Sequence, residues 1–147
     1  MDNLNMVDIL LVEDDPRDAE MIVRAIRKQN IANPLFVVQD GAEALDFLFC
    51  RGAYSGRNVS RPPKVILLDL KLPKVNGLEV LKAIKSEEWS RSIPVVIVTS
   101  SREDPDIKTA YALGANSYVV KPVDSSAFID TMSRLGLYWL LVNQPPA

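Results

Sequence analysis

Residues 65–77 read VILLDLKLPKVNG, and this stretch indicates the class of fold. It begins with four apolar residues, 65–68, and then changes to the carboxylate of Asp69. A strand with one face in water alternates apolar and polar residues, so an unbroken apolar run predicts a strand buried on both faces. Strands of this kind belong to parallel sheets that helices cover on either side.

Four other apolar runs rich in Val, Ile and Leu occur along the chain, at residues 7–12, 35–38, 95–98 and 118–120. Segments with helical spacing separate the runs, so that five strands and five helices alternate. This order predicts a single α/β domain with an open five-stranded parallel sheet, helices on both faces and right-handed crossovers. Ligands of such folds bind beyond the carboxyl ends of the strands.

Helix start signals support the alternation. Asp15 can cap a helix that takes Pro16 in its first turn. Asp40 followed by Glu43 has the spacing of a capping box, which predicts the start of a second helix. The remaining helices are predicted over residues 77–85, from Asp104-Pro105 to near Gly114, and from Asp124 onward.

Polar residues stand where the predicted strands end. Glu13 and Asp14 follow the first strand, Asp69 the third, Thr99 the fourth and Lys121 the fifth. Carboxylates gathered at one edge repel one another, and an oxygen-rich site of this kind suits Mg²⁺. With the ion bound, Asp69 can act as a nucleophile toward a phosphoryl group, while Lys121 offsets charge and Thr99 donates a hydrogen bond.

Four stretches resemble the sequence landmarks of two-component response-regulator receiver domains: ILLVEDD at 9–15, ILLDLKLPKVNG at 66–77, VVIVTSS at 95–101 and GANSYVVKP at 114–122. Together they span nearly the whole chain. The resemblance implies a flavodoxin-like (βα)5 receiver fold and a phosphorelay function, in which a partner histidine kinase supplies the phosphoryl group. It also implies a protein that assists its own phosphorylation and dephosphorylation without being a turnover enzyme.

The resemblance assigns the acidic positions of the site. Asp69 matches the phosphoacceptor, Glu13 and Asp14 match the acidic pair around Mg²⁺, and Lys71 matches the residue that lends a backbone carbonyl to the metal. Glu13 departs from the commonest pattern, because Asp is more usual at this position. Its extra methylene brings the carboxylate further toward the metal, and we expect Mg²⁺ binding to survive this change.

The remaining matches concern the phosphoryl group and the switch. Thr99 and Lys121 match the hydroxyl and the lysine that contact phosphate, and Tyr118 matches the aromatic switch position. Its ring turns inward when the hydroxyl moves toward the phosphoryl group. Ser100 is small, which leaves the site open to small phosphodonors and to water.

The C-terminal part suggests a stand-alone receiver domain over residues 1–142, with a short tail at 143–147 and no effector domain. The tail, together with RPP at 61–63 and the loop before it, resembles response regulators that partner phytochrome-type histidine kinases. The apolar residues 137–142 exceed what one core covers. They predict a homodimer through the fourth helix, the fifth strand, the fifth helix and this apolar segment.

Composition excludes several other classes. The 147 residues carry a net charge of -2 with a pI near 5.2, so no direct nucleic-acid partner is expected. No histidine is present, which excludes histidine triads and a histidine kinase. The single Cys50 forms no internal disulfide, and no apolar run is long enough to span a membrane, so a cytoplasmic location is expected.

Three alternatives use the same residues differently. Within signalling, the protein could relay or store phosphate between kinases. An Asp-nucleophile phosphatase has a similar layout, but its DxDx[TV] motif needs an acid where Lys71 stands. A dinucleotide-binding module would need GxGxxG after the first strand, and the sequence has none there.

Overall fold

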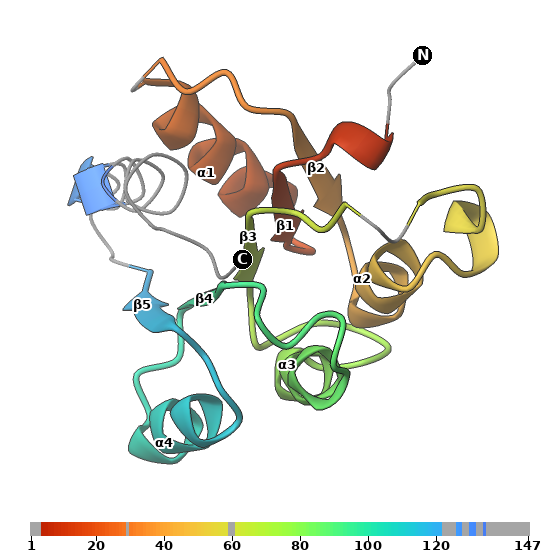
Figure 1. The fold of residues 1–147 in the computed structure, drawn as a ribbon. Coiled ribbons are helices and arrows are strands. Elements are labelled where there is room, and N and C mark those ends of the chain that lie inside the picture. The colour runs from red at the N-terminus through yellow and green to blue at the C-terminus, as the bar shows by residue number, and fades with distance from the viewer. Residues whose placement is uncertain are drawn as a thin grey trace.

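The computed structural model describes residues 4–28, 30–58 and 61–121 and five isolated positions, Ser126, Ala127, Asp130, Thr131 and Arg134. Figure 1 shows short strands flanked by helices. The strands are β1 (Ile9–Val12), β2 (Leu35–Val38), β3 (Val65–Leu68), β4 (Val95–Thr99) and β5 (Ser117–Val120). The helices are α1 (Pro16–Lys28), α2 (Gly41–Leu48), α3 (Gly77–Ser86) and α4 (Asp104–Ala112), with 3₁₀ turns η1 (Leu4–Met6) and η2 (Gly52–Tyr54).

All strand pairs are parallel, and the strand order is β2-β1-β3-β4-β5. This is the order of flavodoxin-like folds, so the predicted fold class is confirmed. The chain leaves β1 toward one edge of the sheet and returns to build the other edge from β3 onward. The switch point of the sheet therefore lies between the carboxyl ends of β1 and β3.

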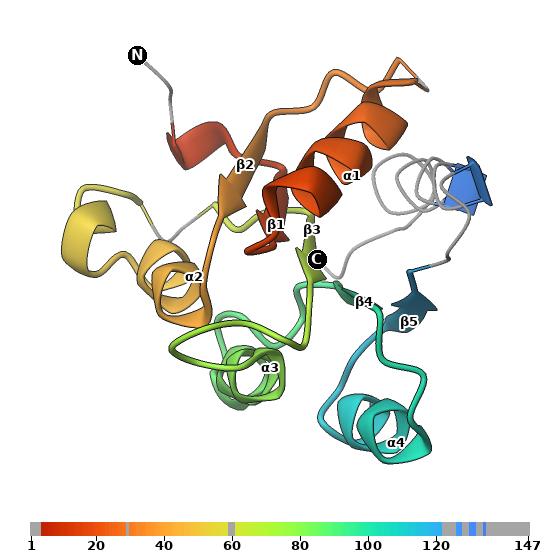
Figure 2. The same cartoon turned by 180° about the vertical axis from the view of Figure 1, so that it is seen from behind.

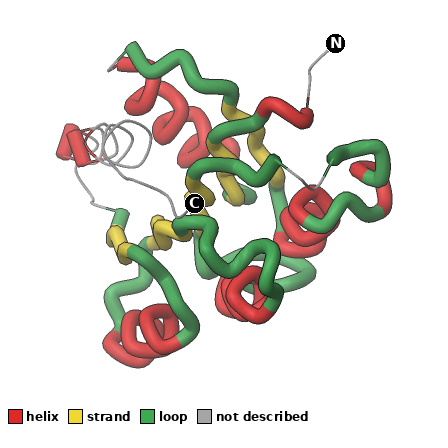
Figure 3. Tube along the Cα trace, viewed as in Figure 1, coloured by secondary structure: helices red, strands yellow, loops and turns green. Residues whose placement is uncertain are grey.

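Two layers of helices cover the sheet, because successive strand residues point to opposite faces. Leu10 and Val12 of β1 belong to the core that holds the buried residues of α2 and α3. Ile9 and Leu11 belong to the core that holds the buried residues of α1. Figures 1 and 2 show α1 on one side of the sheet and α2, α3 and α4 on the other, and Figure 3 colours the same layers by type of structure.

The first strand is shorter than the apolar run predicts, since it begins at Ile9 and not at residue 7. The Asp8 and Ile9 N–H groups both donate to the Pro34 carbonyl, at 2.9 and 3.1 Å, so regular pairing starts only at Ile9. The Asp8 carboxylate is held by Asn33 at 2.8 Å and by Arg61 at 2.9 Å. Polar partners outside the sheet thus fix the segment that leads into β1.

Helix caps match the start signals. The Arg17 N–H donates to Asp15 Oδ1 at 2.8 Å, as expected of a cap in front of Pro16. The Glu43 N–H donates to Asp40 Oδ1 at 2.7 Å, which confirms the second predicted helix start. Removal of such a side-chain acceptor costs about 1 kcal/mol.

Three predictions fall outside the described residues. The fifth helix, predicted from Asp124, is represented only by the five isolated positions. The apolar segment 137–142 and the tail 143–147 lie wholly outside. The proposed dimer face can therefore be followed in the structure only over α4 and β5.

A close backbone approach shapes the loop between β3 and α3. Asn76 caps α3 by accepting the Glu79 N–H at 3.0 Å, and the Gly77 N–H donates to the Leu70 carbonyl at 2.8 Å. A Cβ atom built at Gly77 would lie 2.2 Å from the Asp69 carbonyl oxygen. Only glycine lets α3 start this close to the backbone that carries Asp69.

We therefore expect Gly77→Ala to lower the free energy of unfolding by about 1–3 kcal/mol, because backbone atoms must move to admit the methyl group. Urea unfolding measures the change. Gly56→Ala is the matched control, since a Cβ at Gly56 meets nothing within 4 Å, and its effect should stay within about 0.5 kcal/mol. Equal stability of the two variants would contradict the close approach.

Candidate functional site

The predicted site residues converge at the switch point. The Glu13 N–H donates to the Val38 carbonyl at 3.0 Å, and the Asp69 N–H donates to the Val12 carbonyl at 3.1 Å. These bonds continue the strand pairing by one residue, and they place both acids at the carboxyl ends of β1 and β3. The Lys121 N–H donates in the same way to the Thr99 carbonyl, at 2.7 Å.

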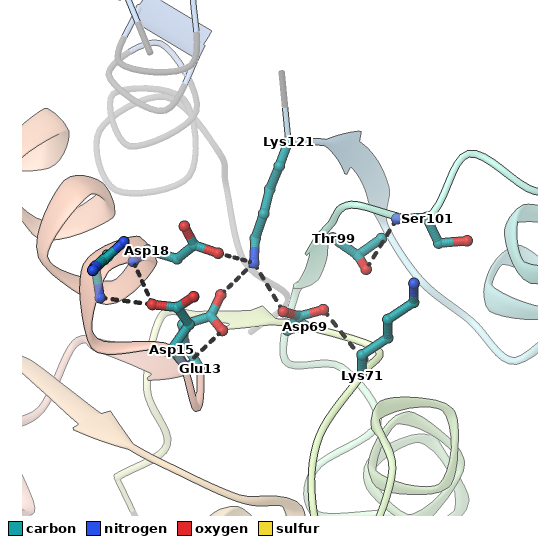
Figure 4. Close-up of polar contacts among 9 residues, drawn as sticks. Glu13, Asp15, Asp18, Asp69, Lys71, Thr99, Ser101 and Lys121 are labelled. Atoms are coloured by element: carbon teal, nitrogen blue, oxygen red, sulfur yellow. Dashed lines mark hydrogen bonds and ion pairs between the residues drawn. The ribbon is translucent and has the colours of Figure 1, made fainter. Parts of the chain in front are cut away.

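The Lys121 ammonium group joins three carboxylates (Figure 4). Its Nζ lies 2.7 Å from Glu13 Oε1, 2.8 Å from Asp18 Oδ2 and 2.9 Å from Asp69 Oδ2. An ammonium group has three donors, so these contacts can use all of them. Burial alone lowers the pKa of Lys121, but the three hydrogen bonds outweigh burial and hold the pKa above its usual value.

The two oxygens of the Asp69 carboxylate have different partners. Oδ1 accepts the Lys71 N–H at 3.2 Å, and Oδ2 accepts the Lys121 ammonium. The Asp69 residue is only 6% exposed. Two donors from different elements therefore set the orientation of this carboxylate.

Glu13 is the most buried acid of the site, at 2% exposure. Its Oε2 accepts the Asp15 N–H at 3.2 Å. Burial raises the pKa of the Glu13 carboxyl to about 7, and the charge on Asp69 adds to the rise against the opposing pull of Lys121. Keeping Glu13 ionised beside Asp69 therefore costs free energy, which a second cation would lower.

The acids of the site fit a divalent metal ion. Carboxylate oxygens of Glu13, Asp14 and Asp69 all lie within 4.8 Å of one another, and Asp14 is exposed to solvent. Oxygen ligands from several carboxylates are those that Mg²⁺ and Mn²⁺ bind. The structure places Lys71 beside Asp69, as its N–H contact shows, and the metal role of the Lys71 carbonyl stays a prediction.

Thr99 and Tyr118 both form a hydrogen bond with Ser101. The Ser101 N–H donates to Thr99 Oγ1 at 3.4 Å, and the Tyr118 hydroxyl donates to the Ser101 carbonyl at 3.0 Å. Thr99 is fully buried, and Tyr118 is half-buried. The Ser101 hydroxyl also bonds Asp106 of α4, at 2.5 Å. The predicted switch residues are thus connected to each other and to α4.

Asp18 is the member of the site that sequence reasoning missed. It lies in the first turn of α1, and its carboxylate contacts Lys121 from a position 103 residues away in the chain. The one available signal was that a helix beginning at Pro16 places residue 18 beside the end of β1. This reasoning predicts where Asp18 lies, but it does not predict that Lys121 is its partner.

The response regulator receiver domain family matches this chain over residues 9–133. The chain belongs to this family. Among known proteins, the receiver is similar to FilR2 of Methanothrix harundinacea, a probable methanogenesis regulatory protein. The two are 41% identical over 138 residues, which cover 94% of this chain and 86% of FilR2.

Solved structures of phytochrome response regulators have the same fold. The phosphorylated cyanobacterial phytochrome response regulator RcpA has a TM-score of 0.87 and 37% identity, over 95% of this chain and 97% of its own. The bacteriophytochrome response regulator RtBRR has a TM-score of 0.76 and 50% identity, over 96% and 85%. The matched region covers most of each of these two chains.

A related structure bears on the metal. Response regulator Rcp1 of Synechocystis is 34% identical over 139 residues, which cover 95% of this chain and 92% of Rcp1. It has been solved in a Mn²⁺-bound form, with a TM-score of 0.87 over 95% of this chain and 98% of that one.

Within the described part of the receiver, no helix combines the length and the apolarity needed to cross a membrane.

Because the pKa of Glu13 is raised, we expect the stability of the metal-free protein to depend on pH. Between about pH 4.5 and 7 the folded protein holds a proton on Glu13 that the unfolded chain releases. As pH rises through this window, the free energy of unfolding of the wild type should therefore fall relative to that of Glu13→Gln, by up to about 3 kcal/mol. Urea unfolding in EDTA measures it.

Glu20→Gln is the control for this pH series, because Glu20 is exposed on α1 and pairs only with Arg24 among the contacts of the described chain. This variant supplies the baseline against which the pH dependence of Glu13→Gln is compared. A flat difference for Glu13→Gln would show that the Glu13 carboxyl is ionised throughout the window.

Proposed function

We propose that this receiver is a response regulator whose Asp69 accepts a phosphoryl group from a partner histidine kinase in a metal-dependent reaction. The supporting observation is the orientation of the Asp69 carboxylate between the Lys71 N–H and the Lys121 ammonium, next to Glu13 and Asp14. RcpA, which is similar over almost the whole chain, is known in a phosphorylated state.

The proposed transfer forms one bond to phosphorus and breaks another. One Asp69 carboxylate oxygen forms a bond to phosphorus while the bond from phosphorus to the kinase imidazole nitrogen breaks. The electron pair of the broken bond stays on the imidazole, which takes up a proton. The signal ends by hydrolysis. Water bonds to phosphorus and the Asp69 carboxylate leaves, which releases inorganic phosphate.

The residues of this chain have separate parts in that step. Lys121 offsets negative charge on the phosphoryl oxygens, and Lys71 orients the attacking carboxylate through its N–H. Thr99 accepts the Ser101 N–H, so its own hydroxyl proton can donate to a phosphoryl oxygen. Glu13, Asp14 and Asp69 would hold a divalent ion, which supplies further charge neutralisation when bound. Each protein carries at most one phosphoryl group at a time, which suits a switch and not a turnover enzyme.

The signal would leave the site through Thr99. Movement of its hydroxyl toward the phosphoryl group loosens the contact with the Ser101 N–H, and Ser101 also contacts Tyr118 and Asp106. Phosphorylation then favours one of two pre-existing arrangements of β5 and α4. The face built from these elements is where we place the partner-binding and dimer surface.

A phytochrome-type histidine kinase is the partner that we propose. The similarity to RcpA and RtBRR supports this choice, because each is a phytochrome response regulator that matches the chain almost from end to end. We further propose that the receiver works in the cytoplasm and acts without direct contact to nucleic acid. The acidic net charge of -2 is consistent with protein partners.

We expect incubation with acetyl phosphate and Mg²⁺ to add one alkali-labile phosphoryl group to the wild type. Asp69→Asn should abolish the adduct, because an amide oxygen cannot form the acyl phosphate. Asp104→Asn on the exposed start of α4 serves as the control and should be modified like wild type. Intact-protein mass spectrometry measures the adduct, and an unmodified wild type would refute the proposal.

Metal binding should raise stability through the acidic cluster. At a Mg²⁺ concentration a hundred times Kd, the free energy of unfolding of the wild type should rise by about 2.7 kcal/mol. Asp14→Asn should lose most of this increment, whereas Asp15→Asn should keep it, because Asp15 caps α1 and lies outside the cluster. Urea unfolding with and without Mg²⁺ compares the neighbours, and equal increments would rule out Asp14 as a ligand.

A further inference from the structure

Lys121 contacts acids of two kinds. Glu13 and Asp69 belong to the cluster that fits a divalent ion, whereas Asp18 lies outside that cluster. The Asp18 contact is as short as the others, with Nζ and Oδ2 2.8 Å apart. Figure 4 shows the Lys121 side chain reaching down between Asp18 on one side and Asp69 on the other.

The first two contacts are the ones that function would disturb. Oxygens of Glu13 and Asp69 that hold a divalent ion lose negative charge density, so their attraction for an ammonium group weakens. Formation of the acyl phosphate removes the charge of the Asp69 carboxylate itself. Neither change acts on the Asp18 carboxylate, which lies outside the cluster.

Asp18 is well placed to hold its position through these changes. It lies in the first turn of α1, where its own N–H donates to the capping Asp15 Oδ1 at 3.4 Å. Ala19 and Ile22 of the same helix are buried in the core, which fixes α1 in place. The Asp18 side chain is 29% exposed against 13% for Lys121, so the contact joins a partly exposed carboxylate of the helix to a more buried ammonium group.

We propose that Asp18 is a positioning residue that keeps the Lys121 ammonium beside Asp69 while metal and phosphoryl group occupy the other two acids. This inference rests on the proposed function. A lysine side chain has many rotamers, and without a fixed acceptor its ammonium samples positions away from the phosphoryl oxygens. Asp18 acts through Lys121 and does not touch the reacting atoms.

The first test follows the Lys121 ammonium itself by NMR, because a hydrogen-bonded ammonium exchanges its protons with water more slowly than a free one. Without metal, Asp18→Ala should still show the Lys121 signal, since Glu13 and Asp69 remain as acceptors. With Mg²⁺, the wild type should keep the signal and Asp18→Ala should lose it. A signal that survives Mg²⁺ in Asp18→Ala overturns the proposal.

The second test measures the rate of phosphorylation at saturating acetyl phosphate. In this reaction an Asp69 oxygen bonds to phosphorus, and acetate leaves with the electron pair of the broken bond. Asp18→Ala should be about tenfold slower than wild type, because misplacement of a charge-stabilising group costs rate. Asp18→Asn keeps an acceptor oxygen and should stay within about threefold of wild type.

Two controls show that the effect acts through Lys121. Glu20→Ala removes a neighbouring carboxylate of α1 that is 69% exposed, and its rate should equal that of wild type. In a Lys121→Ala background, Asp18→Ala should change the rate by less than about twofold. An unchanged tenfold loss in that background would mean that Asp18 acts elsewhere, and it would overturn the inference.

The outcomes separate this inference from the proposed function. A wild type that takes up no phosphoryl group refutes the proposed function, and the inference with it. A wild type that is modified, next to an Asp18→Ala variant modified at the same rate, refutes only the positioning role. Loss in Asp18→Ala with rescue in Asp18→Asn supports it, because a merely structural defect would not depend on an acceptor oxygen.

Discussion

The contact between the Lys121 ammonium and the carboxylates of Glu13, Asp18 and Asp69 is the interaction on which the site depends. Acids placed this close inside a protein repel one another, and burial adds to the cost of keeping them ionised. Glu13 shows that cost directly, because burial raises its pKa to about 7. Lys121 compensates only part of the charge, and this incomplete compensation is why the acidic cluster of Glu13, Asp14 and Asp69 fits a divalent ion.

The fold produces this charge cluster as a consequence of its topology. Parallel strands bring their carboxyl ends to one edge, and the order β2-β1-β3-β4-β5 places β1 and β3 side by side at the switch point. The loop after β3 must then run between the site and α3. Gly77 permits this, since a side chain at that position would collide with the Asp69 carbonyl.

The same arrangement connects one side of the site to β5 and α4. Thr99 contacts the Ser101 N–H, and the Ser101 carbonyl and hydroxyl contact Tyr118 and Asp106. Three hydrogen bonds therefore connect Thr99 with β5 and α4. Lys121 sits on the other side of Asp69 and is held by α1, so the two sides of the site are supported by different elements.

The amino-acid sequence by itself determined the class of fold and most of the site. Apolar runs, the caps at Asp15 and Asp40 and the acids at strand ends are local features, and local physics is enough to interpret them. Tertiary structure decided what depends on strand order and on close approach. The contact of Asp18 with Lys121 joins residues 103 positions apart, and the close approach at Gly77 involves the backbone of the residues that follow β3. The hydrophobic periodicity of the sequence indicates which residues are buried, but it does not indicate which residues contact one another across the fold.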